Sequence, residues 1–255
     1  MSLYRVIFLT AIALAAILIP AGQVMAAPPM TLPGIGLTIS PTDEPEGVVA
    51  TLQILFILTI LALAPAIIVL MTSFTRVIVV LSFVRVALAT NQVPPNQVII
   101  GLALFITFFI MAPVLENIRV DALEPFLANE ITQEAALANA EYHIKGFMLT
   151  HTDPRDLALF INASNMEQPE VPQDVSLMAL IPAFVISELR TAFIMGFLIF
   201  IPFLVIDMVV ASTLMSMGMF MIPPIIVSLP FKILLFIMAD GWNLIVGSLL
   251  RSYGL

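Results

Sequence analysis

Long apolar runs separated by short polar stretches make up most of this chain from residue 48 onward. Val48–Leu70 is the first run, 23 residues interrupted only by Thr, Gln53 and Pro65, and Val98–Leu115 is the second. Each run is long enough to cross a hydrocarbon core of roughly 30 Å as an α-helix. The pattern predicts an all-α membrane protein in which residues 48–115 form a first apolar helical hairpin.

Two arginines interrupt the apolar pattern between these runs. Arg76 and Arg85 are nine residues apart in TSFTRVIVVLSFVR, a spacing of about two and a half turns of an amphipathic helix. Asn91–Gln97, NQVPPNQ, predicts a turn, because neither proline continues the preceding helix and one of them can start the next. We expect Arg76 and Arg85 to be positive charges on the cytoplasmic side of the first span.

Residues 116–174 are polar and acidic, with eleven acidic side chains against three basic ones, and they account for the whole net charge of −8. The stretch EITQEAALANAEYHIKGF has a helical composition, and DPRDLALFINA starts with Asp153 as an N-cap and Pro154 at the first helical position. We expect a small, mainly helical region outside the cytoplasm.

Residues 175–255 return to an apolar pattern that carries a few isolated charges. Glu188 and Arg190 interrupt Ser176–Ile206, whereas Asp207 and Lys232 bracket a run that contains Pro223-Pro224. A hairpin at the two prolines would bring Asp207 and Lys232 together. A lone charge in lipid costs about 2.5 to 3.5 kcal/mol, so each charge needs a partner.

These four charges have two interpretations. They form a network that holds helix hairpins or neighbouring subunits in register, or some of them reach the membrane interface. Glu188 and Arg190 are two residues apart and therefore lie on different helix faces, so each needs a separate partner.

Five of the fifteen methionines lie between Asp207 and Lys232, namely Met208, Met215, Met217, Met219 and Met221. Flexible thioether side chains beside Gly218 and the two prolines are typical of a deformable constriction. The same stripe is also typical of ordinary helix packing. Both interpretations stay open at this point.

The N-terminus predicts a cleavable signal peptide over residues 1–26. Arg5 is its charged region, Val6–Ile19 its apolar region, and VMA before residue 27 a small-residue cleavage site. The alternative is a first membrane helix. Residues 27–47, rich in Pro, Gly and Thr, then form a flexible arm outside the cytoplasm.

Composition excludes several functions. The 61% apolar and 10% charged side chains give a mean hydropathy of +1.12, and no cluster of Lys and Arg is present to bind nucleic acid. Without cysteine there is no disulfide and no thiolate metal site. No enzyme motif is present, and His143 and His151, eight residues apart, are a weak metal signal that we interpret as two solvent-exposed histidines. We therefore expect no enzyme, metal or cofactor.

The chain nevertheless contains long motifs that resemble the FliP family of flagellar export proteins, which includes virulence type III secretion counterparts. They are TSFTRVIVVLSFVR, NQVPPNQVIIGLALFITFF, AFVISELRTAFIMGFLIFIPFLVIDMVVAS, MGMFMIPP and LPFKILLFIMADGWNLIVGSL. The resemblance runs from about residue 48 to the C-terminus and is weakest in the acidic region.

The resemblance implies an export gate in the bacterial inner membrane, at the flagellar basal body, with part projecting to the periplasmic side. FliP copies, a pentamer in the family, assemble with FliQ, FliR and other export apparatus membrane proteins, and unfolded flagellar polypeptides pass through. Their helical hairpins stack into a helically arranged pore, which would make the four charges contacts between subunits.

The family's pore is closed by a methionine ring that matches Met219, Phe220 and Met221, with Met217 nearby; Phe220 stands where the family has methionine. The family's charge pair matches Asp207 and Lys232.

Three alternatives remain. The first is a virulence counterpart, which the signal peptide and the acidic segment disfavour. The second is a proton-coupled small-solute transporter that uses Asp207 and Glu188, although the inverted repeats of such proteins are not visible. The third is a purely structural scaffold of the flagellar base.

Overall fold

The computed structural model describes residues 54–55, 58–59, 62–63, 65–90, 93–164, 169 and 171–255. Every regular element in these ranges is a helix, so the all-α prediction is confirmed for them. The predicted signal peptide (1–26) and arm (27–47) lie outside the described residues, as does the start of the first apolar run. Both assignments stay predictions.

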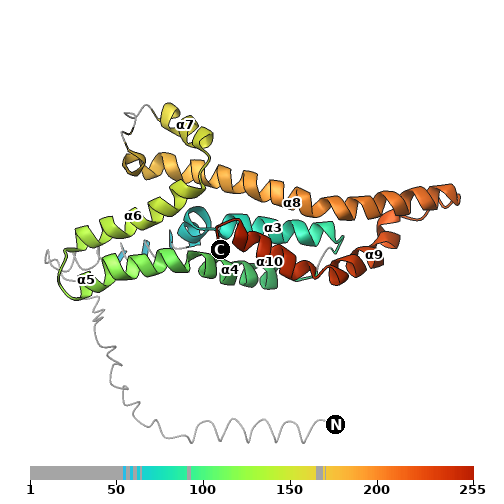
Figure 1. The fold of residues 1–255 in the computed structure, drawn as a ribbon, viewed down its shortest axis with the longest axis horizontal. Coiled ribbons are helices and arrows are strands. Elements are labelled where there is room, and N and C mark those ends of the chain that lie inside the picture. Colours follow the sequence, from blue (N-terminus) through green and yellow to red (C-terminus); the bar gives the residue numbers. More distant parts are fainter. Residues whose placement is uncertain are drawn as a thin grey trace, which may run out of the picture. The chain divides into compact units, whose positions relative to one another are not determined.

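The described helices cover most of the chain after residue 73 (Figure 1). In chain order they are α3 (Phe74–Ala87), α4 (Asn96–Ile118), the π-helical turn η1 (Arg119–Leu123), α5 (Glu124–Leu127), α6 (Gln133–His151), α7 (Pro154–Ala163), the 3-10 turn η2 (Pro172–Asp174), α8 (Leu177–Ser216), α9 (Pro224–Met238) and α10 (Gly241–Arg251). A short helix, Pro65–Met71, precedes α3 and is bent from it by 80°.

Helix α8 is the longest element, with 40 residues, and α3 runs alongside it (Figure 1). At 1.5 Å per residue α8 is about 60 Å long, roughly twice the thickness of a hydrocarbon core. The polar stretch at residues 187–190, which interrupts the apolar pattern, lies inside this helix, and the helix also continues through Pro202. Glu188 and Arg190 are good helix formers, and other helices supply partners for their charges.

The core lies where α3, α4, α8 and α10 meet. One buried cluster joins these helices through mostly branched side chains, including Val77, Val80, Leu81, Ala103, Ile106, Ala192, Phe203, Ile245 and Leu249. A second cluster holds the N-terminal part of α8 against α6 through Met148, Val175, Leu180 and Phe184. Helix α8 therefore takes part in both buried clusters, one with α3, α4 and α10 and one with α6.

The acidic region does not begin at a break in the structure. α4 starts at Asn96 directly after Pro95, as the turn prediction requires, and continues through η1 and α5 as one helix, Asn96–Leu127. The expected boundary between residues 115 and 116 lies inside this helix.

Helices α6 and α7 then pack against α8. Asp153 is the N-cap of α7 with Pro154 in its first turn, which confirms that local prediction.

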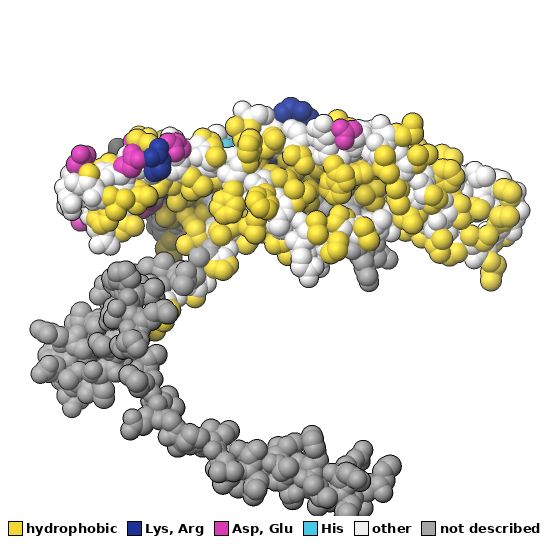
Figure 2. Space-filling view, turned by 90° about the horizontal axis from the view of Figure 1, so that it is seen from below, with side chains coloured by type: hydrophobic (Ala, Val, Ile, Leu, Met, Phe, Trp, Pro, Cys, Tyr) yellow, Lys and Arg dark blue, Asp and Glu magenta, His cyan; other side chains and the backbone are white. Residues whose placement is uncertain are grey.

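Two helices, Asn96–Leu127 and Leu177–Ser216, are long and apolar enough to cross a membrane. Two bent pairs, Pro65–Met71 with α3 and α9 with α10, would raise the number of spans to four if each pair is one span. Figure 2 shows hydrophobic side chains over much of one face, with acidic side chains gathered mainly towards one end. Phenylalanines on α4 and α8, such as Phe105 and Phe197, are largely exposed in the single chain.

Candidate functional site

The turn between α8 and α9 presents the methionine-rich segment at the tip of a helical hairpin (Figure 1). Gly218 has a φ of 76°, and α8 ends in two hydrogen bonds, from Gly218 N to the Met215 carbonyl and from Met219 N to the Leu214 carbonyl. This is the glycine-dependent helix termination that leaves the following residues outside the helix. The exposed fractions of the tip side chains are 64% for Met217, 41% for Met219, 77% for Phe220 and 95% for Met221.

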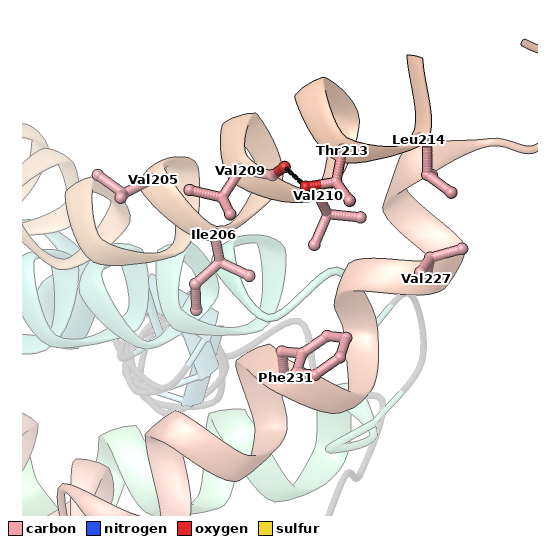
Figure 3. A pocket seen from close by; sticks show the side chains of 8 residues that line it. All are labelled: Val205, Ile206, Val209, Val210, Thr213, Leu214, Val227 and Phe231. Atoms are coloured by element: carbon pink, nitrogen blue, oxygen red, sulfur yellow. Dashed lines mark hydrogen bonds between the residues drawn. The ribbon is translucent and has the colours of Figure 1, made fainter. Parts of the chain in front are cut away.

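The predicted hairpin at Pro223-Pro224 is confirmed, because α9 starts at Pro224 and packs back against α8. An apolar groove of about 490 Å³ lies between the two arms near the tip. Figure 3 shows Ile206 and Val210 of α8 pointing towards the side where α9 presents Val227 and Phe231. The groove has almost no polar lining, so in a membrane protein it is suited to contact lipid or another apolar helix.

Asp207 and Lys232 clasp the two arms of this hairpin. Lys232 Nζ donates a hydrogen bond to Asp207 Oδ2 at 2.6 Å. The Ser228 hydroxyl, which is fully buried, donates to Asp207 Oδ1 at 2.5 Å. The side chain of Lys232 is only 2% exposed, and that of Asp207 28%. Two donors on one carboxylate therefore fix the register of α9 against α8.

Glu188 has its partner on α3. Arg76 Nε lies 3.0 Å from Glu188 Oε2, and Arg76 Nη2 lies 2.5 Å from Oε1, which is a bidentate pair. The Tyr253 hydroxyl donates to the same carboxylate, and its ring lies 4.0 Å from the Arg76 guanidinium carbon. Both charges are buried. The pair therefore ties α3, α8 and the C-terminal residues into one unit.

Arg190, two residues further along α8, has separate partners at the start of α7. Its guanidinium donates to Asp153 Oδ2 at 2.8 Å and to Asp156 Oδ1 at 2.6 Å. The Ser187 hydroxyl donates to Asp156 Oδ2 and accepts from the Asp153 backbone N–H. The prediction that Glu188 and Arg190 need separate partners is thus confirmed.

Asp153, the N-cap of α7, lies outside the candidate spans, at the junction where Arg190 of α8 contacts α7, and its pKa is lowered there. The Arg155 side chain and its backbone N–H both donate to the Asp153 carboxylate. These bonds, with smaller contributions from the charges of Arg155 and Arg190, lower the pKa of Asp153 to about 2. The N-cap of α7 therefore stays ionised far below neutral pH.

The predicted charges all take part in contacts between helices of this chain. Glu188, Arg190, Asp207 and Lys232 each have a partner on another helix, which agrees with the interpretation that they hold helices in register; contacts between subunits stay a prediction. Arg76, which we expected on an amphipathic helix at the cytoplasmic side of the first span, lies on α3 and is carried into the core, where it is 3% exposed. Arg76 is buried because it pairs with the buried carboxylate of Glu188. Burying either charge without its partner would destabilise the fold far more than burying the pair.

The remaining predicted positions lie apart from these clusters. Arg85 is partly exposed and donates to Asn96 Oδ1 near the start of α4. His143 contacts Asp121 and His151 contacts the Phe147 carbonyl, so the two histidines do not share a site. Both are half-buried, and the expectation that they are solvent-exposed is wrong. Among the described residues, no group of His, Asp and Glu side chains is arranged to hold a metal ion.

Sequence reasoning missed several members of these clusters. Ser228, Ser187 and Asp156 are short polar residues with no distinctive spacing, and only their burial against a carboxylate or arginine identifies them. Tyr253 lies four residues beyond the last motif, which ends at Leu249. The one available signal was that a buried charge with several open hydrogen-bonding positions needs more than one partner.

Comparison with known proteins agrees with the resemblance. The sequence profile of the FliP family matches residues 57–249. The flagellar biosynthetic protein FliP of Bacillus subtilis (strain 168) is 57% identical over 217 residues, which cover 85% of this chain and 98% of the relative. The proteins of the same name from Aquifex aeolicus (strain VF5) and Pectobacterium carotovorum are 50% and 49% identical, each over 80% of this chain and over 87% and 79% of the relative. This chain, whose described regular elements are all helices and include apolar helices able to span a membrane, therefore belongs to the FliP family of flagellar biosynthetic proteins, which are components of type III protein export.

Proposed function

We propose that this chain is a subunit of the flagellar export gate in the bacterial inner membrane. It forms, with further copies of itself and with FliQ and FliR, a conduit for unfolded flagellar proteins, and it acts as a channel and not as an enzyme. Met217, Met219, Phe220 and Met221 form an apolar collar, here called the tip collar, that closes the conduit. The observation that carries the proposal is the exposure of these four side chains at the end of a braced hairpin.

An apolar collar excludes ions because water is unfavourable in a narrow apolar constriction. Unbranched methionine side chains also re-pack around passing shapes, so the collar can yield to a polypeptide. The short turn from Met217 to Pro223 cannot surround a polypeptide alone. A closed ring therefore requires several copies, in agreement with the pentamer that the family resemblance implies.

The contacts of Asp207 with Ser228 and Lys232 hold α8 and α9 together near the turn that carries the tip collar. Asp207 lies ten residues before Met217 on α8, a distance of about 15 Å along the helix axis. With α9 held in register there, the turn has little freedom to slide. In this proposal the charges contribute to assembly by preparing each hairpin within its own chain, and the apolar groove of Figure 3 is left for a neighbouring helix.

Helix α8 also supports a gate that projects from the membrane. Its length of about 60 Å exceeds what one upright crossing needs, and the acidic helices α6 and α7 pack on its N-terminal part. These acidic helices belong on the periplasmic side in this proposal. The transporter alternative receives no support from the carboxylates it would use, since Asp207 and Glu188 are each engaged by a cation.

The proposal is tested by replacing Met219 and Met221 with alanine in a strain that lacks its own copy of the protein. We expect the assembled gate to form, flagellar subunits to be secreted, and ion leakage across the membrane to rise. Met208→Ala is the matched control, because Met208 is an exposed methionine too, at 63%, but lies on α8 away from the tip. Unchanged leakage in an assembled gate contradicts the tip collar, and solute uptake by the purified single protein favours the transporter.

A further inference from the structure

His151, at the end of α6, packs against the C-terminal residues of the chain. Its ring centroid lies 4.8 Å from that of Tyr253 and 4.7 Å from that of Phe147. His151 Nδ1 lies 2.9 Å from the Phe147 carbonyl oxygen, which can only accept, so Nδ1 carries the proton in the neutral ring. The other nitrogen, Nε2, is then the atom that takes up a proton.

Tyr253 couples this histidine to the buried pair of Arg76 and Glu188. Its hydroxyl donates to Glu188 Oε2 at 2.5 Å, and Arg76 stacks on its ring. Arg76 Nη1 also donates to the Ser252 carbonyl at 3.2 Å. The segment Ser252–Tyr253, here called the C-terminal latch, is therefore held by α3 and α8 and covered by His151.

A cavity of about 340 Å³ opens beside the latch and gives protons a route to it. Its lining includes His151, Arg76, Arg190, Asp153 and Ser252. The cavity is open to the outside and partly polar, so water can enter it. A change of charge on His151 can therefore follow the pH of the surrounding solution.

The charges around His151 favour its neutral form. Burial lowers the pKa of His151, the Phe147 carbonyl opposes this, and the positive charge of Arg76 lowers the pKa further. The acidic groups nearby, Asp153 and Asp156 at α7, are occupied by Arg190 on α8.

Several other ionisable groups on α6 and on the elements packed against it form pairs of their own, and Asp174 on η2 is not among them. Glu188 is bound to Arg76. On η1, Asp121 contacts His143, while Arg119 pairs with Glu116 of α4 and Glu124 of α5; within α6, Lys145 pairs with Glu141. A proton on His151 therefore places a second cation beside Arg76, and the acidic residue that lines the same cavity, Asp153, is already paired with Arg155 and Arg190.

We propose that the C-terminal latch is acid-sensitive, and that protonation of His151 releases Ser252 and Tyr253 from Arg76 and Glu188. A group whose pKa is lowered by folding contributes stability that is complete above its ordinary pKa, about 6.5 for histidine, and is lost as the pH falls below it. The latch is closed at neutral pH and opens on mild acidification. This inference concerns the fold of one chain and does not depend on the proposed conduit.

Hydrogen exchange of the full chain in lipid nanodiscs tests the latch. Exchange of the amides of residues 249–255 is compared at about pH 7.5 and about pH 5.5, after division by the intrinsic rate of an unstructured peptide at each pH. We expect several-fold faster corrected exchange at the lower pH in the natural protein. His151→Phe keeps an aromatic ring but takes up no proton, so its exchange is expected to be slow at both pH values.

His143→Phe is the matched control, because it removes the chain's other histidine from the same helix. It is expected to retain the response to acid. His151→Gln, which is neutral and smaller, is a second variant if His151→Phe does not fold. Equal corrected exchange at the two pH values in the natural protein overturns the proposal, and so does a response that persists in a folded His151 variant.

Discussion

Lys232 Nζ lies 2.6 Å from Asp207 Oδ2, and the two residues face each other across a hairpin although 25 positions separate them in the chain. The contact is asymmetric, because the lysine side chain is 2% exposed and the aspartate side chain is 28% exposed. This asymmetry determines what happens when either partner is removed.

Replacing Asp207 by alanine is expected to destabilise the protein more than replacing Lys232 by methionine. The first change leaves a buried ammonium group without its partner, at a cost of about 3 to 5 kcal/mol. The second leaves a carboxylate that still reaches solvent and still accepts from Ser228. Thermal unfolding of the purified chain in detergent, followed by far-UV circular dichroism, measures the order. An equal or reversed order contradicts the asymmetric clasp.

Exchanging the charges, Asp207→Lys with Lys232→Asp, tests the same pair in the assembled gate. Either single reversal is expected to block assembly, because it places like charges together across the hairpin. The double reversal is expected to restore assembly in part, since the pair is re-formed but Ser228 no longer faces a carboxylate. If the double variant assembles no better than the single ones, the direct contact does not contribute to assembly.

Arg76→Lys is expected to destabilise the chain severely although it conserves the charge. Lysine cannot reproduce the bidentate contact with Glu188 together with the bond to Ser252 and the stacking on Tyr253. We expect a large fall in the unfolding temperature, measured as above. Arg119→Lys is the control, because Arg119 also contacts two carboxylates but its side chain is 51% exposed, and it should have little effect.

Gly196→Ala is expected to weaken the packing of α8 on α3. A Cβ atom at residue 196 would lie 2.5 Å from Phe83 ring atoms, so the ring must move. Overpacking of this kind costs about 1 to 3 kcal/mol. Gly101→Ala in α4 is the control, because nothing lies within 4 Å of its added methyl group. Phe83→Leu should restore part of the stability to Gly196→Ala, and the contact is wrong if it does not.

Asp153→Asn is expected to reduce the acid sensitivity of the α7 junction. The pKa of Asp153, about 2 in the folded chain, lies below its ordinary value, so its contribution is complete above about pH 4 and is lost as the pH falls towards 2. Asparagine keeps the N-cap but not the charge. The variant should therefore show a smaller loss of stability between about pH 4 and pH 2, measured by thermal unfolding. An unchanged pH profile contradicts this role.

Local features of the fold were predictable from the sequence because they depend on neighbouring residues. The start of α7 at Asp153 and Pro154, and the start of α4 after Pro95, follow from capping and from the missing proline N–H. The contact between Asp207 and Lys232 was predictable for a similar reason. A proline pair between two apolar arms leaves few arrangements other than a hairpin.

The contact between Arg76 and Glu188 was not predictable in the same way, because 112 positions separate the residues. The apolar pattern placed Arg76 between the first two apolar runs and Glu188 in a later one, and periodicity alone does not tell which helices pack together. The same limit applies to the other charge on α8. The sequence indicates that Glu188 and Arg190 need separate partners, and only the packing of α3 and α7 against α8 shows which residues these are.

Membership of a multi-subunit export gate is tested by native mass spectrometry of the full chain, expressed with its neighbouring membrane genes and extracted in mild detergent. We expect one complex of fixed stoichiometry that contains several copies of this chain and two smaller membrane proteins. A monomer or dimer of this chain alone, under conditions in which all the partners are expressed, would contradict it.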